Sequence, residues 1–78
     1  MRALVEIKNN EQHIVHTRKV KFHKINDMKV EITLVVKGHG LLKIQVPESA
    51  ASLYKSQLVE RGFANFSGMD VDTTNYTG

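Results

Sequence analysis

The chain of 78 residues is long enough for one small domain but leaves little room for a deep catalytic cleft, and the absence of cysteine excludes disulfides and thiolate metal sites. The formal net charge is +3 and is unevenly placed. Residues 1–30 hold seven Lys or Arg against three Asp or Glu (+4), whereas residues 31–78 hold four against five (−1). No apolar run approaches the roughly 20 residues of a membrane span and no signal-peptide core begins the chain, so we expect an unprocessed cytoplasmic protein outside the membrane.

The N-terminal part of the chain predicts two strands joined by a tight turn. Residues 2–8 alternate apolar and polar side chains, which is typical of a strand buried on one face. The pair Asn9-Asn10 tolerates the left-handed backbone of a hairpin turn. A second strand is expected over residues 12–23.

The second strand has an ambiguous phase. If it is regular, its even-numbered face points inward and carries His16 and Arg18 into the core. A β-bulge near residues 16–19 would instead bury Val15 and free Arg18, which avoids the cost of burying an unpaired guanidinium. Both alternatives stay open from the sequence.

The most regular pattern lies in residues 28–47 and predicts a hairpin. Apolar side chains occupy every even position from 28 to 36 and from 42 to 46, so one face of both strands is apolar. The segment Gly38-His39-Gly40 supplies the positive φ angles of the reversal. A three-residue loop there is expected to pair Val36 with Leu42.

The C-terminal third predicts one helix. Pro47 ends the preceding strand and suits the start of a helix, and apolar residues recur with a period of 3.6 over residues 47–61. Gly62 is expected at the left-handed position that ends the helix. Beyond it, Phe66, Met69 and Val71 allow a short fifth strand at an edge of the sheet.

These elements predict an α+β fold, a four-stranded antiparallel β-meander with one C-terminal helix packed on one face (ββββα). Residues 1–72 form the single domain in this prediction, and residues 73–78 form a frayed polar tail. The helix must cover the even-numbered face, because nothing else in the chain can bury either surface. The predicted core is Val5, Ile7, Val20, Phe22, Val30, Ile32, Leu34, Val36, Leu42, Ile44, Val46, Leu53, Tyr54 and Leu58.

The opposite face of the sheet is the predicted binding surface. A turn at residues 25–27 would pair Phe22 with Met28 and place Lys21 directly opposite Lys29, a like-charge pair that an anion can bridge. The first and fourth strands are expected to be the exposed edges of the sheet, open to a strand from a partner. The candidate binding residues are Lys19, Lys21, His23, Lys29, Val35, Lys37, Leu41 and Lys43.

Chemistry-bearing residues give no catalytic or metal-binding pattern. His13 and His16 are three residues apart, which puts them on opposite faces of a regular strand, and no carboxylate or thiolate completes a site. The carboxylates of Asp70 and Asp72 fall in a polar C-terminal segment. We therefore expect no enzyme, no metal and no cofactor.

The sequence favours a small non-enzymatic protein-binding module, an adaptor or a stoichiometric inhibitor of a larger machine. Its partner would be a protein with an acidic surface, bound by the lysine-rich face or by an exposed edge strand. The alternative is a sequence-nonspecific nucleic-acid-binding protein that uses the same face against phosphates. The available strand edges also allow a homodimer.

Overall fold

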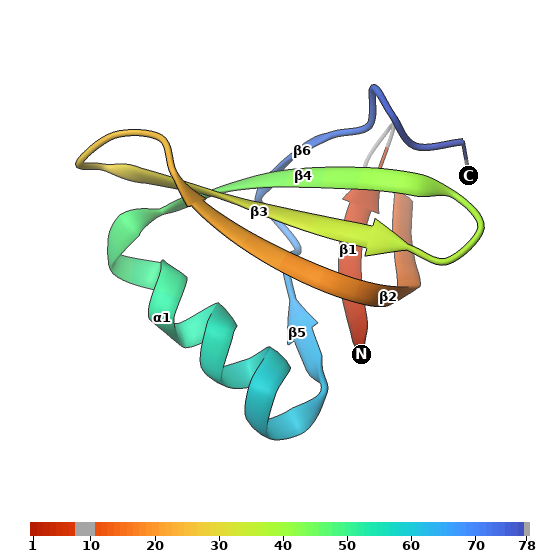
Figure 1. Cartoon of the computed structure of the whole chain (residues 1–78), viewed down its shortest axis with the longest axis horizontal. Coiled ribbons are helices and arrows are strands. Elements are labelled where there is room, and N and C mark those ends of the chain that lie inside the picture. Colours follow the sequence, from red (N-terminus) through yellow and green to blue (C-terminus); the bar gives the residue numbers. More distant parts are fainter. Residues whose placement is uncertain (8–10, 78) are drawn as a thin grey trace.

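The computed structural model describes residues 1–7 and 11–77, so the predicted Asn9-Asn10 turn and Gly78 lie outside the described residues. The sheet has six strands in the order β5-β1-β2-β3-β4-β6, and one helical segment follows β4 (Figure 1). The predicted α+β class, with an antiparallel meander and one C-terminal helix, is confirmed. The elements are β1 (Arg2–Ile7), β2 (Glu11–Lys24), β3 (Lys29–Val36), β4 (Gly40–Pro47), α1 (Glu48–Ser56), η1 (Gln57–Arg61), β5 (Phe63–Asn65) and β6 (Asp70–Asp72).

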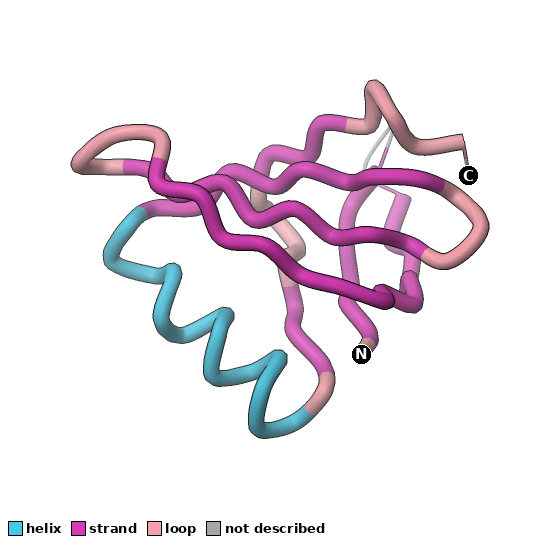
Figure 2. The backbone as a smooth tube through the Cα atoms, in the orientation of Figure 1, coloured by secondary structure: helices cyan, strands magenta, loops and turns pink. Residues whose placement is uncertain are grey.

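A β-bulge divides β2 into two halves. The first half pairs with β1 and the second with β3, and the register with β3 shifts between Thr17 and Lys19. Val15 is 5% exposed, and Arg18 is exposed to solvent. The buried Thr17 hydroxyl lies 2.9 Å from the Lys19 carbonyl oxygen and 3.2 Å from that of Val35, so it has acceptors within reach. Of the two alternatives for this strand, the bulge is therefore the one the chain adopts, and β2 changes direction there (Figure 2).

Both predicted hairpin registers are wrong by an even number of residues. Leu42 pairs with Leu34 instead of Val36, because the turn closes earlier, with the His39 N–H donating to the Val36 carbonyl at 3.1 Å. Phe22 pairs with Ile32 instead of Met28, which sits in a longer turn and is 78% exposed. An even shift keeps every side chain on its predicted face, so the division into an apolar and a polar face survives.

The helical segment matches the predicted span to within a residue. The first part is α-helical, the last five residues form a π-helical turn, and Gly62 ends it with φ 64° as expected. The segment lies below the sheet in Figure 1 and diverges from it toward its C-terminal end. Leu53, a predicted core residue, is 57% exposed, whereas Leu58, nearer the C-terminal end of the segment, is buried.

Two short strands close the sheet beyond the predicted meander. β6 pairs antiparallel with β4, which confirms the predicted edge strand over part of residues 66–71 and extends it to residue 72. β5 was not expected and pairs parallel with β1; the chain is fixed there by hydrogen bonds from the Arg2 N–H to the Gly62 carbonyl and from the Phe66 N–H to the Leu4 carbonyl, both 2.8 Å. The predicted exposed edges are therefore wrong, since β1 and β4 are each paired on both sides.

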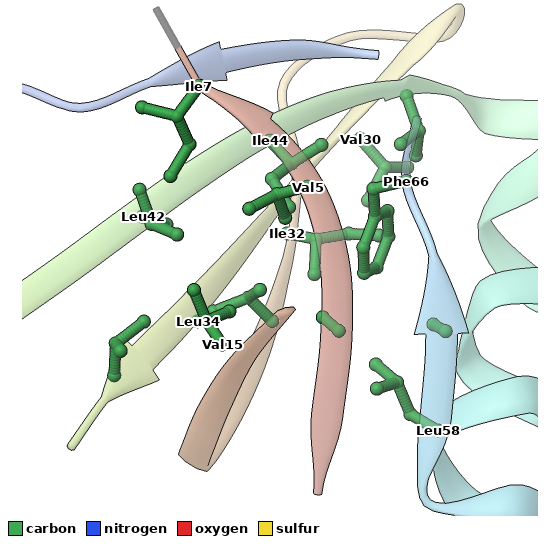
Figure 3. Packing of buried hydrophobic residues seen from close by; sticks show 14 residues of the cluster. Val5, Ile7, Val15, Val30, Ile32, Leu34, Leu42, Ile44, Leu58 and Phe66 are labelled. Atoms are coloured by element: carbon green, nitrogen blue, oxygen red, sulfur yellow. The ribbon is translucent and has the colours of Figure 1, made fainter. Parts of the chain in front are cut away.

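The core is centred on an aromatic residue that the meander pattern does not include. Phe66 is fully buried, its ring lies beside Val30 and Ile32 in Figure 3, and it stacks on Tyr54 with ring centroids 4.7 Å apart. Ten of the predicted core residues are buried: Val5, Ile7, Val30, Ile32, Leu34, Val36, Leu42, Ile44, Val46 and Leu58. Val20 and Tyr54 are partly buried against them. Phe22, at 38% exposed, and Leu53 are the two predicted core residues that lie at the surface. Four further residues complete the core: Ala3, Val15, Ala64 and Phe66.

The segment after β6 lies against the β3–β4 turn. The Leu41 N–H donates to the Asn75 carbonyl at 3.0 Å, and the Thr77 N–H donates to the His39 carbonyl at 2.8 Å. Tyr76 forms a bridge with Gly40. Fraying of this segment in solution stays a prediction.

Candidate interaction surface

The face of the sheet away from the helix presents three cross-strand rows of side chains. After the bulge, odd-numbered residues of β2 point away from the core, as do the odd-numbered residues of β3 and β4. We call this surface the outer face. Its rows are Lys19–Val35–Leu41, Lys21–Thr33–Lys43 and His23–Glu31–Gln45.

Six of the eight candidate binding residues lie in these rows, and the other two lie beyond them. Lys29 and Lys37 sit at opposite ends of β3, eight residues or about 26 Å apart along the strand. The predicted pairing of Lys21 with Lys29 is wrong, because the longer turn places Lys21 opposite Thr33. Instead, Lys21 and Lys43 flank Thr33 from the two neighbouring strands, about 10 Å apart at the backbone. Lys43, rather than Lys29, is therefore the lysine across the sheet with which Lys21 can share an anion.

An apolar pair lies at one end of the outer face. Val35 and Leu41 are direct cross-strand partners and both are half-buried. Lys19 is the partner of Val35 on β2, and Lys43 follows Leu41 two residues along β4. The pair is thus an apolar centre with basic side chains around it.

The strand β6 adds carboxylates to the border of the outer face. Asp72 lies opposite Lys43, and Asp70 lies opposite Gln45. The hydroxyl and the N–H of Thr74 both donate to Asp72 Oδ1, and these bonds lower the pKa of Asp72, with a smaller contribution from the Lys43 charge. The surface is therefore basic on the β2 side and acidic on the β6 side. Sequence reasoning missed this because a three-residue strand does not reveal its partner or register.

Other polar groups of the described residues do not assemble a reactive site. No three His, Asp or Glu side chains within residues 1–7 and 11–77 are grouped so that they could hold a metal ion. His13 lies 3.4 Å from Glu11 on the surface, and the His39 ring lies 5.5 Å from that of Tyr76. The absence of catalysis stays a prediction.

Comparison with protein-family models, curated proteins and solved structures gives no match for this chain. In the described part of the chain, no helix combines the length and the apolar character that crossing a bilayer requires. The function is accordingly argued from the surface of the molecule.

Proposed function

We propose that the chain is a small non-enzymatic protein-binding module, an adaptor or a stoichiometric inhibitor of a larger assembly, whose outer face binds an acidic protein surface. The observation that carries this proposal is the half-buried Val35–Leu41 pair with Lys19 and Lys43 beside it. Protein interfaces combine an apolar centre with a polar rim, and a basic rim steers an acidic partner toward the centre. The module would act by occupying a surface and would need no pocket.

The alternative function, sequence-nonspecific nucleic-acid binding on the same face, has weaker support. The three rows of the outer face hold no aromatic ring other than the imidazole of His23, and single-strand binders stack bases on such rings. Glu31 lies within the rows, and Asp70 and Asp72 border them, so phosphates would meet carboxylates on one side. Nucleic-acid binding is therefore treated as an outcome of the test.

The test is affinity capture from nuclease-treated extract of the source cells, comparing matched variants. One variant removes the apolar pair (Val35→Ser with Leu41→Ser), and a second reverses two charges (Lys21→Glu with Lys43→Glu). The control, Val59→Ser with Arg61→Glu, makes one change of each kind at exposed positions on the far side of the helix. We expect an acidic protein that wild type and control retain equally and that both outer-face variants retain at least tenfold less.

The proposal would be overturned if the outer-face variants retained the partner as well as wild type does, or if nuclease treatment abolished its capture. A parallel titration with a 20-base-pair DNA duplex separates the alternative. A protein that neutralises about four phosphates loses roughly 100-fold in affinity between 50 and 200 mM salt, whereas the proposed module has no measurable affinity to lose. The expected homodimer is tested on the same samples by light scattering.

A further inference from the structure

We propose that the second half of β2, residues 19–24, is the acceptor for an extended acidic peptide segment, which adds to the sheet as one further strand. This inference rests on the proposed function, because it presumes that the chain binds protein, and it goes on to specify the conformation and charge of the bound segment. It replaces the expected acceptor edges, β1 and β4, which are already paired on both sides.

The backbone of this segment is open along one side. β1 pairs with residues 11–16 of β2, and β3 pairs with the second half of β2 on the side opposite the open one. The Ile25 N–H donates to the Lys29 carbonyl at 3.0 Å, so in this antiparallel register the N–H and carbonyl groups of residues 19, 21 and 23 point to β3. Those of Val20, Phe22 and Lys24 therefore point outward. These groups lie on the side away from the ladder with β3, and no hydrogen bond of the turns, loops or caps among the described residues involves them.

A groove runs beside the open backbone. It lies between β2 and α1, has a volume of about 520 Å³, and has Phe22, Val30 and Ala51 among its lining residues. The Phe22 side chain is 38% exposed and lines this groove together with residues of the first turns of α1. An added strand would lay alternate side chains into the groove, where Phe22 offers an apolar contact, while its backbone bonds to the edge. Phe22, which the sequence pattern predicts in the core, is thus the apolar contact that distinguishes this edge.

The charge of the edge specifies the occupant. Arg18, Lys19, Lys21 and Lys24 lie along or beside the open segment, and residues 12–24 contain no acidic side chain. Lys55 adds a positive charge across the groove, against the single carboxylate of Glu48. A second copy of the chain pairing through the same edge would set lysines against lysines, which destabilises a strand pair. The Lys24 ammonium lies 3.9 Å from Asp27 Oδ1, so an acidic extended segment meets the opposite charge chiefly at Lys19 and Lys21 and, across the groove, at Lys55.

The length of the acceptor segment also favours it over the other open edges of the sheet. The acceptor segment has six residues, whereas the terminal strands β5 and β6 have three each. Affinity in strand addition comes from successive main-chain hydrogen bonds, and a six-residue edge offers the N–H and carbonyl groups of three residues.

The probe is a synthetic seven-residue peptide with capped ends that alternates glutamate with valine, isoleucine and threonine. Its affinity for the full chain is measured by calorimetry at 50 mM salt. Three control ligands are the same peptide with lysine in place of glutamate, the acidic peptide N-methylated at alternate residues on its bonding edge, and a dT12 oligonucleotide. We expect binding of the acidic peptide alone, with at least a tenfold loss on N-methylation. Equal binding of the N-methylated peptide or of dT12 would show attraction by charge only and overturn the inference.

Variants of one residue isolate the backbone contribution. Phe22→Ala removes the groove contact and keeps the N–H, and we expect a 3- to 10-fold loss of peptide affinity. Phe22→Pro also removes the outward N–H and should cost at least a further tenfold; proline is tolerated at an edge position whose N–H faces solvent. Circular dichroism checks that both variants fold, and the N-methylated peptide on wild type tests the same bond without any mutation. Unchanged affinity in folded Phe22→Pro would overturn strand addition.

The two proposals fail separately. Val35→Ser with Leu41→Ser leaves the open edge intact and should keep peptide binding while losing the captured partner. If wild type captures a partner through the outer face but does not bind the peptide, strand addition is wrong and the protein-binding module stands. If the peptide binds but no outer-face partner is captured, the outer-face proposal is wrong.

Discussion

Replacement of Phe66 by alanine tests whether this residue, outside the predicted meander, organises the core. Phe66 is fully buried, with a relative exposure of 0%, and its ring stacks on that of Tyr54 with the ring centroids 4.7 Å apart. Removal of a buried phenylalanine ring costs about 3–5 kcal/mol through lost burial and the cavity left behind. A domain of 78 residues has a total stability of about 4–12 kcal/mol, so Phe66→Ala should remove about a quarter of it or more.

The matched comparison is Leu53→Ala, on the same helical segment that Phe66 holds. Leu53 is 57% exposed, so its truncation loses less than half of a full leucine burial, about 1 kcal/mol or less. Urea unfolding followed by circular dichroism measures both. With a urea dependence of about 1 kcal/mol/M, the midpoint should fall by about 3–5 M for Phe66→Ala and by about 1 M or less for Leu53→Ala.

A double-mutant cycle between Tyr54 and Phe66 locates the helix more directly. The stacked rings should show a coupling energy of about 0.5–1.5 kcal/mol. A coupling near zero, or equal losses for Phe66→Ala and Leu53→Ala, would refute the packing described here. The helix would then lie flatter on the sheet, and the groove beside β2 would close.

Three further predictions concern the turns and the bulge. Gly40→Ala places a Cβ against the Asn75 carbonyl oxygen at φ 95°, so the segment after β6 should detach and the free energy of unfolding should fall by about 2 kcal/mol or more, measured by thermal melting. Deletion of Arg18 removes the extra residue of the bulge, so Val15, Thr17 and Val20 fall on one face of a regular strand and the chain should keep a cooperative melting transition. Thr74→Val should raise the pKa of Asp72 toward 3.8 in an NMR titration; in the wild type the lowered pKa stabilises the fold above pH 3.8, a contribution lost as the pH falls through the folded-state pKa.

Each of these changes has a control at a neighbouring position or at the same one. Gly38→Ala meets no atom within 4 Å at φ 78° and should cost only about 1–2 kcal/mol, and an equal cost at Gly40 would contradict the clash. Arg18→Ala keeps the residue count and should stay within about 0.5 kcal/mol of wild type. Thr73→Val should leave the Asp72 titration unchanged; a similar rise in both variants would show that the Thr74 hydroxyl is not the cause.

Periodicity predicts the faces of the sheet because it survives errors in register. The predicted partners of Phe22 and Leu42 differ from the observed ones by four and two residues, and in both cases the even-numbered residues of the paired strands keep their predicted face of the sheet. The bulge could be predicted as one of two alternatives, since burial of Arg18 would be costly. No local pattern in the sequence, however, shows at which residue β2 stops pairing with β1 and begins to pair with β3. Tertiary pairing with β1 and β3 decides it.

The features of the fold that depend on the segment after the helix could not be predicted from the sequence. Three residues of β5 are too few for an alternation, and Phe66 lies in a stretch whose partner is β1, sixty residues earlier in the chain. With this stretch beside β1, the helix packs through Tyr54 and Leu58 rather than through Leu53. The outer face could thus be predicted, but its acidic border and the open edge of β2 could not.

Amide hydrogen exchange of residues 19–24 is the most direct test of the account, because it reads the direction of each N–H group in the free and peptide-bound protein. In the free protein, the amides of Lys21 and His23 should exchange slowly and those of Val20, Phe22 and Lys24 rapidly. Saturation with the acidic peptide should slow the exchange of these three amides at least tenfold. Slow exchange at all residues of this stretch in the free protein, or no change when the peptide binds, would contradict the open edge on which the account depends.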